Sequence, residues 1–174
     1  GRAAFVERSL GEHPDAAVVI LDINTFGGRV DAAVRIRDAL LDSKVPTVAF
    51  VHRRAISAGA LIALACDDIY VTSGASMGAA TPFSKGEKGP AEVSEKMISY
   101  MRAEMRATAL AKKRPGPIAE AMVDPDVVLP GIITKGKLLT LDTQTALKYG
   151  VAVGQAESLP ELLTHLQVAD RAQK

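Results

Sequence analysis

The sequence predicts an α/β domain in which helices flank a mostly parallel sheet. Near-continuous apolar runs alternate with helical patterns along the first half of the 174-residue chain, an order typical of strand–helix–strand units. Apolar residues make up 48% of the chain and aromatic residues only 4%, so Ala, Val, Ile, Leu and Met have to build the core. This length fits a single domain, which we assign to residues 1–168, with a polar C-terminal tail at 169–174.

The first half gives a β-α-β-α-β order after a short helix at 3–10. Ala16–Ile23 is the near-continuous apolar run expected of a strand buried on both faces, and a turn follows over Asn24–Gly28. Val30–Leu41 has the apolar spacing of a helix. The next predicted elements are a strand at 47–51, a polar connection, a small-residue helix at 60–66 and a strand at 68–72.

The second half is less regular. Small residues at 73–80 indicate a turn and a short strand, and the Gly- and Pro-rich stretch 81–91 predicts a mobile loop. Val93–Lys112 is the longest helical pattern, with Ser94 as its N-cap. Its stripe of Met97, Met101 and Met105 is interpreted as packing. The remaining elements are a helix at 118–123, a hairpin formed by 127–134 and 138–141, a helix at 142–149, a strand at 151–153 and a helix at 159–166.

Composition and charge exclude several function classes. The net charge is +1, from 21 basic and 20 acidic residues, and no basic stripe carries interleaved aromatics, so nucleic acid is not an expected partner. The three histidines are scattered and Cys66 lies in an apolar run, so neither a metal nor a cofactor is predicted and the cysteine is expected to be buried. No apolar run reaches the length of a membrane span. Membrane attachment is therefore expected only through segments outside this chain.

Three sequence features together indicate nucleophilic catalysis. Gly27 and Gly28 directly follow the first strand, Ser57 stands at the start of a small-residue helix, and a lysine stands at the start of the long helix. A serine nucleophile needs a base and also needs N–H donors aimed at the developing oxyanion. The N–H groups of Gly28 and of Ala58 are suited to that task, because glycine leaves its backbone unshielded and a helix N-terminus has free donors. Taken singly, Ser57 can be a helix cap and the glycine pair a turn.

The base is identified by elimination. His52 lies five residues before Ser57 on an extended segment and is expected to point elsewhere, and the other histidines lie in the end segments. A Ser-Lys dyad is then the remaining common solution. Lys96 is the one lysine in the first turn of the long amphipathic helix, and a helix N-terminus and burial both lower a lysine pKa. Taken alone, it is a solvated surface lysine.

Four runs of sequence stand out: LDINTFGG (21–28), AISAGALIALACDDIYV (55–71), SMGAATPF (76–83) and TALKYGVA (145–152). Together and in this order they resemble the NfeD family, more narrowly the N-terminal ClpP-class protease domain of its long-form, membrane-bound members. The resemblance implies a ClpP/crotonase-like fold. It also implies that Ser57 is the nucleophile, that Lys96 is the base, and that Gly27 and Gly28 contribute to the oxyanion hole.

The resemblance further implies partners and a location. Such domains are the soluble parts of membrane-bound proteases that form homodimers or higher homo-oligomers. They are expected on the extracytoplasmic face, where they cleave hydrophobic segments of a stomatin- or flotillin-like partner. Two departures stand out: Phe26 replaces a usual proline before the glycine pair, and the chain starts after a strand that usually precedes the first helix. Phe26 and Gly59 are candidates for the wall of the substrate groove.

Other readings remain open. A non-catalytic oligomeric scaffold for membrane partners does not need Ser57 or Lys96. A crotonase-like acyl-CoA enzyme uses the same fold, although the sequence offers no convincing catalytic carboxylate or CoA-phosphate site. Arg53 and Arg54 are interpreted as a solvated connection, with the binding of a substrate carboxylate as the alternative. The stretch 81–91 is a candidate lid, and Lys96 is then expected to reach Ser57 only with substrate bound.

Overall fold

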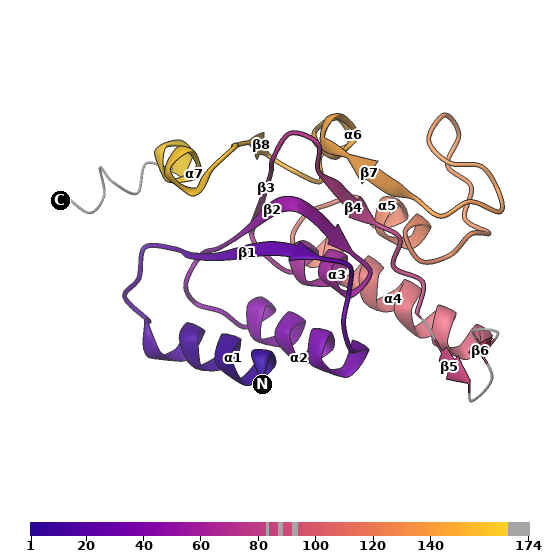
Figure 1. Cartoon of the computed structure of the whole chain (residues 1–174), viewed down its shortest axis with the longest axis horizontal. Helices are drawn as coiled ribbons and strands as arrows, with labels where there is room; N and C mark the ends of the chain where they lie inside the picture. Colours follow the sequence, from indigo (N-terminus) through magenta and orange to yellow (C-terminus); the bar gives the residue numbers. More distant parts are fainter. Residues whose placement is uncertain (83, 87–88, 92–93, 167–174) are drawn as a thin grey trace.

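A computed structural model of the chain describes residues 1–82, 84–86, 89–91 and 94–166; the predicted tail at 169–174 lies outside them. Their main feature is a mixed, mostly parallel sheet (Figure 1). The long strand β2 pairs in parallel with β1, β3 and β4, β3 pairs in parallel with β8, and β4 pairs antiparallel with β7. The bounds are β1 Val19–Thr25, β2 Thr47–Ile56, β3 Asp68–Val71, β4 Ser76–Gly78, β7 Thr140–Asp142 and β8 Gly154–Gln155. The predicted fold class is confirmed.

Helices cover the sheet unequally. The larger core joins the first six helices to one face, while Val48 and Phe50 point to the other face and pack with Leu162 of α7. Figure 1 shows α1 and α2 below β1 and β2, and α7 on the opposite side. The bounds are α1 Arg2–Glu12, α2 Val30–Leu41, α3 Ala58–Leu64, α4 Glu95–Ala111, α5 Gly116–Ala121, α6 Thr143–Lys148 and α7 Leu159–Leu166. No helix in the described ranges has the length and apolar character needed to cross a membrane.

Two predictions about the first strands were wrong. β1 is only half-buried over Val19, Ile20 and Leu21, because among the described strands it pairs with β2 alone and therefore lies at the edge of the sheet. The polar connection expected after Val51 is a continuation of β2 to Ile56. This extension exists because β2 changes partner, from β3 over 48–51 to β4 over 54–56.

Two further predictions failed in the second half. The hairpin expected from 127–134 and 138–141 does not form. A tight turn closes the first segment through the Leu129–Ile133 bridge, and β7 pairs with β4 instead. In the stretch expected to be a loop, Ser84–Gly86 (β5) and Gly89–Ala91 (β6) pair as a short antiparallel hairpin. Positions 83, 87 and 88 of that stretch lie outside the described part of the chain.

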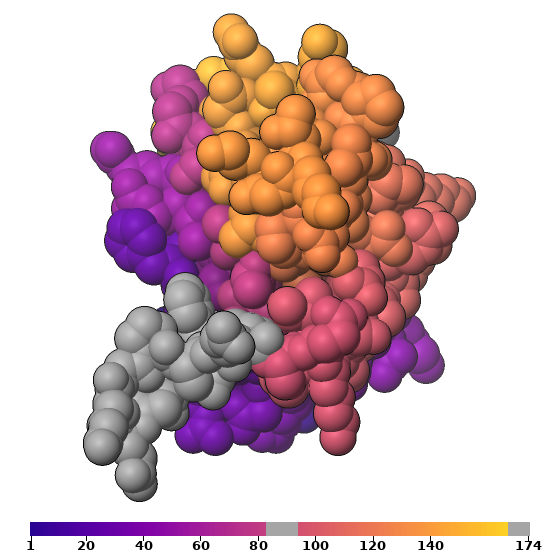
Figure 2. Space-filling view, turned by 90° about the vertical axis from the view of Figure 1, so that its right-hand side faces the viewer, coloured from indigo at the N-terminus to yellow at the C-terminus, as the bar shows by residue number. Residues whose placement is uncertain are grey.

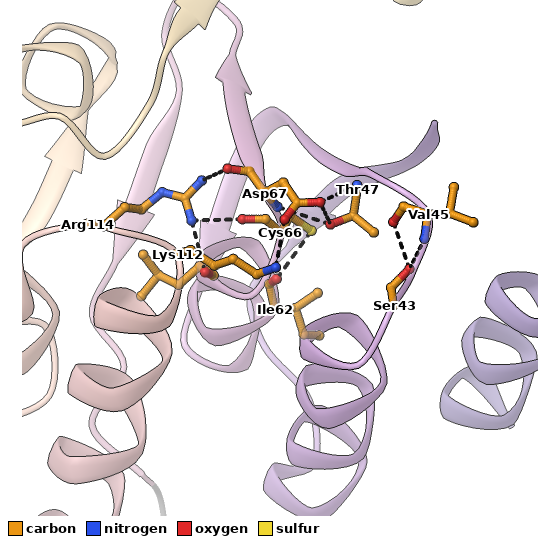
Figure 3. Close-up of polar contacts among 9 residues, drawn as sticks. Ser43, Val45, Thr47, Ile62, Cys66, Asp67, Lys112 and Arg114 are labelled. Carbon is orange, nitrogen blue, oxygen red and sulfur yellow. Dashed lines mark hydrogen bonds and ion pairs between the residues drawn. The ribbon is translucent and has the colours of Figure 1, made fainter. Parts of the chain in front are cut away.

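A buried arginine ties the end of α3 to the rest of the core (Figure 3). The Arg114 side chain is 5% exposed, and its guanidinium donates hydrogen bonds of 2.8–3.0 Å to four backbone carbonyls, those of Leu64, Cys66, Asp67 and Val151. Leu64 ends α3, so the cation meets the negative end of the helix dipole. Burial lowers the pKa of Arg114, but arginine is basic enough to stay charged.

Cys66 and Asp67 follow α3, and their pKa values are shifted in opposite directions. Burial raises the pKa of the Cys66 thiol to about 12, so the thiol is neutral and the prediction of a buried, inert cysteine is confirmed. Partial burial acts to raise the pKa of Asp67, but hydrogen bonds from Lys112 and from the Thr47 backbone outweigh it and the pKa lies below its ordinary value. Lys112 Nζ lies 2.7 Å from Asp67 Oδ1.

Replacing Arg114 with Met is expected to destabilise the domain by about 3–5 kcal/mol, because four buried carbonyls lose their donor. Arg29→Met is the matched control, since the Arg29 side chain is 82% exposed and pairs with Asp31 at the surface, so its loss is expected to change the stability far less. Urea unfolding followed by circular dichroism measures both. Equal losses in the two variants contradict the role given to Arg114.

Asp67 makes the stability depend on acid pH. Because its folded pKa is lowered, its contribution is present above the unfolded value of about 3.9 and is lost as pH falls through the folded pKa. Wild type is therefore expected to be more stable than Asp67→Asn at pH 6, with the difference shrinking below pH 4. Urea unfolding midpoints across this range test it, and a difference that does not change with pH argues against it.

Candidate active site

Ser57 lies at a sharp turn between β2 and α3. Its backbone has φ 58° and ψ −122°, a conformation that a non-glycine residue adopts only where the surroundings enforce it. The Ser57 N–H donates to Gly78 O at 2.9 Å, and the Ser57 carbonyl accepts from the Ala60 N–H at 2.9 Å. Ser57 occupies the N-cap position, but its hydroxyl makes no capping hydrogen bond. The cap alternative therefore does not explain this serine.

Gly27 packs directly against the serine. Its φ of +133° suits only glycine, and a Cβ built on it falls 3.0 Å from Ser57 Cβ and 3.3 Å from Ser57 Oγ. The Gly27 N–H donates to Thr25 Oγ1 at 3.1 Å. Among the described residues the N–H groups of Gly28 and Ala58 have no hydrogen-bond partner, so these two are free to bind a ligand.

An apolar cavity opens beside this turn. It has a volume of about 820 Å³, lies between α1, β1, α2 and α3, and reaches Gly27, Gly28, Ala58 and Gly59 at one end. Gly59 also allows α3 to approach β1, since a Cβ there would lie 2.5 Å from Thr25 Cγ2. The structure therefore brings five of the predicted site residues together, the four that line this end of the cavity and Ser57.

Lys96 is not joined to this cluster. It lies exposed in the first turn of α4, whose N-cap Ser94 accepts a hydrogen bond from the Met97 N–H at 3.3 Å. Among the described residues no hydrogen bond links Lys96 Nζ to Ser57 Oγ. The expectation that the lysine reaches the serine only with substrate bound stays a prediction. Figure 2 shows this side of the molecule, with the pink residues of α4 in its lower part and the orange 125–150 region above them.

His52 is engaged away from the serine, as expected. Its Nδ1 lies 3.6 Å from Asp22 Oδ1, and its ring stacks on Phe50 at 5.5 Å between centroids. Groups of three or more His, Cys, Asp or Glu side chains able to hold a metal ion do not occur among the described residues.

Phe26 and Arg54 form a contact that the sequence analysis missed. Phe26 is 75% exposed, and the Arg54 guanidinium lies over its ring, 4.8 Å from the centroid. Arg54 Nη1 also donates to Asn24 Oδ1 at 3.2 Å. Arg53 and Arg54 belong to β2 rather than to a solvated connection. The position of Arg54 just before the serine turn was the only signal in the sequence.

Comparison with known proteins places this geometry in a family. Residues 1–173 match the model of the NfeD1b N-terminal domain. The chain is 40% identical over 169 residues to membrane protein NfeD1b of Bacillus subtilis and 31% identical over 160 residues to membrane-bound protease PH1510 of Pyrococcus horikoshii. These matches take in 95% and 89% of the chain but only 38% and 34% of the relatives, so the chain spans little more than a third of their length.

Solved structures agree with the sequence relatives. The membrane-bound stomatin-specific protease 1510-N, in a Lys-to-Ala variant bound to a substrate peptide, superposes with a TM-score of 0.79 at 30% identity, covering 93% of this chain and 72% of that one. ClpP1 of Listeria monocytogenes has a TM-score of 0.64 at 19% identity over 90% of this chain and 84% of its own, which supports the fold alone. The chain belongs to the NfeD1b N-terminal domain family and is related to a membrane-bound protease.

Proposed function

We propose that this domain is a serine endopeptidase in which Ser57 is the nucleophile and Lys96 the general base. The observation that carries the proposal is the strained turn at Ser57, which holds a hydroxyl that makes no capping hydrogen bond against Gly27. The N–H groups of Gly28 and Ala58 in the same turn region have no hydrogen-bond partner among the described residues. Strain at a nucleophile is typical of sites that need the side chain exposed at the end of a strand. The kinship with a membrane-bound protease supports the same reading.

The proposed reaction has two stages. Ser57 Oγ attacks the scissile carbonyl while neutral Lys96 takes the hydroxyl proton, and the N–H groups of Gly28 and Ala58 bind the oxyanion. The tetrahedral intermediate then expels the amine, which receives the proton from Lys96, and leaves an acyl-enzyme on Ser57. Water activated by Lys96 hydrolyses that ester and restores the serine. Gly27 serves this chemistry by leaving room for the hydroxyl.

The cavity indicates the substrate class. Its walls are mainly aliphatic, and it reaches Gly28 and Ala58 at one end, so an apolar side chain beside the scissile bond gains free energy by entering it. The proposed substrate is therefore an apolar segment of a membrane-associated protein. A stomatin- or flotillin-like protein is the proposed partner, because one solved relative is described as stomatin-specific. A homodimer or higher homo-oligomer on the extracytoplasmic face is part of the same proposal.

Reaction with a fluorophosphonate probe tests the dyad, with intact mass and peptide mapping as the readout. Wild type is expected to be labelled at Ser57 only, at a rate that rises from pH 7 to pH 10, because lysine acts as a base only when neutral. Ser57→Ala is expected to remove labelling, and Lys96→Ala to slow it by about 100-fold or more.

The control for that experiment is Lys137→Ala, which removes an exposed lysine outside the site and is expected to react like wild type. Because Lys96 is exposed in the structure, the reaction is run with and without an apolar decapeptide. Absence of labelling under both conditions contradicts the protease and favours the non-catalytic scaffold.

Gly27→Ala is expected to slow labelling of Ser57 by about 100-fold, because the new methyl group meets the serine side chain at 3.0 Å and its backbone is strained at φ +133°. Gly131→Ala is the matched control: it also has positive φ, at +79°, but open space around the added Cβ. Its labelling rate is expected to equal that of wild type. Equal slowing in both variants attributes the effect to general backbone strain.

A further inference from the structure

We propose that Arg54, held against Phe26, is a specificity residue that binds a carboxylate of the substrate next to the apolar segment. The inference rests on the proposed peptidase function and adds a substrate feature to it. The expected substrate is thus an apolar segment carrying an Asp or Glu side chain, or a free C-terminal carboxylate, at a fixed distance from the scissile bond.

A bulge in β2 sets the position of Arg54. Ile23 pairs with Val51 and Thr25 pairs with Ala55, so β2 carries two more residues than β1 across this interval. The bulge includes Arg53, a non-glycine residue at φ 82° whose N–H donates to Thr72 Oγ1 at 3.1 Å. Bulges beside active sites often re-aim a side chain. Here Arg54, which follows Arg53 in the chain, places its guanidinium over the Phe26 ring.

The pair stands next to the nucleophile. Phe26 immediately precedes Gly27, which packs on Ser57, and Arg54 lies three residues before Ser57 in the same strand and turn. The Phe26 ring and the guanidinium therefore stand on the two chain segments that meet at the serine. We expect a peptide that places its carbonyl at Ser57 to pass close to them.

The Arg54 guanidinium has N–H donors left for a ligand. It donates one hydrogen bond to the neutral amide of Asn24 and stacks on Phe26, and among the described residues no carboxylate forms an ion pair with it. The carboxylate of Asp22, two residues before Asn24 on β1, is directed to His52 instead. A guanidinium has five N–H donors in a planar fork that matches a carboxylate.

Stacking on Phe26 pre-organises the Arg54 guanidinium for binding. Contact with an aromatic face limits the rotamers of the arginine side chain, so less conformational entropy is lost when a ligand binds. A half-buried position also strengthens the attraction to a carboxylate relative to open water. The gain stays modest and sensitive to salt, because Phe26 and its surroundings are open to solvent.

Binding is measured on the Ser57→Ala protein, so that no chemistry is needed. The probes are fluorescent ten-residue peptides of Ala, Val and Leu with one Gln, and the same peptides with Glu at that place, with the variable position moved along the peptide. Each is made with a C-terminal amide and with a free acid, which separates a side-chain carboxylate from a chain end. Arg54→Gln is compared with Arg8→Gln, which removes an exposed charge on α1.

One Glu position, or the free acid, is expected to bind about five- to tenfold more tightly than its neutral match, and the preference is expected to fade at 1 M salt. It should vanish in Arg54→Gln, weaken in Arg54→Lys, which lacks the fork, and persist in Arg8→Gln. A preference that survives Arg54→Gln, or binding that never depends on Glu or the free acid, overturns the inference. The fluorophosphonate experiment judges the peptidase separately, so the failure of one is distinct from the failure of the other.

Discussion

The backbone of Ser57 is the constraint on which the rest of the structure depends. A serine at φ 58° is unfavourable by itself and persists only when both neighbouring elements are fixed. On one side, β2 is held by three parallel partners and Gly78 O receives the Ser57 N–H. On the other side, the end of α3 is fixed by Arg114. The strain at the nucleophile is thus balanced by contacts at both ends of a seven-residue helix.

Close approach around that turn explains why the sequence is rich in small residues there. Gly27 meets Ser57, Gly59 meets Thr25, and Gly78 meets Leu139, where an added Cβ would lie 2.5 Å from the carbonyl oxygen. The helix itself is built from Ala, Gly, Leu and Ile, and its small residues let its backbone come close to β1 and β2 at the serine turn.

Local sequence patterns predicted many of the helices and strands. Which strands pair with one another could not be predicted from such patterns. α2 and α7 were predicted to the residue, because their apolar periodicity is a local signal. The edge position of β1 and the pairing of β7 with β4 depend on which distant strand is available, and an apolar run alone does not carry that information. At the site, the Gly27–Ser57 contact follows from motifs on adjacent parallel strands. Whether Lys96 reaches Ser57 depends on how α4 is placed, which no local motif encodes.

The bulge at Arg53 positions both the serine turn and the Arg54 side chain. β2 leaves β3 and joins β4 between Val51 and Arg54, and the extra residues there bring the chain to the serine turn in the register that Gly78 requires. The same displacement turns Arg54 onto Phe26. A proline at position 26 offers no aromatic face, so it would leave the guanidinium unstacked, while Phe26 without Arg54 would be a bare exposed ring. The two residues are therefore best understood as one physical unit, positioned by the strand geometry that also presents the nucleophile.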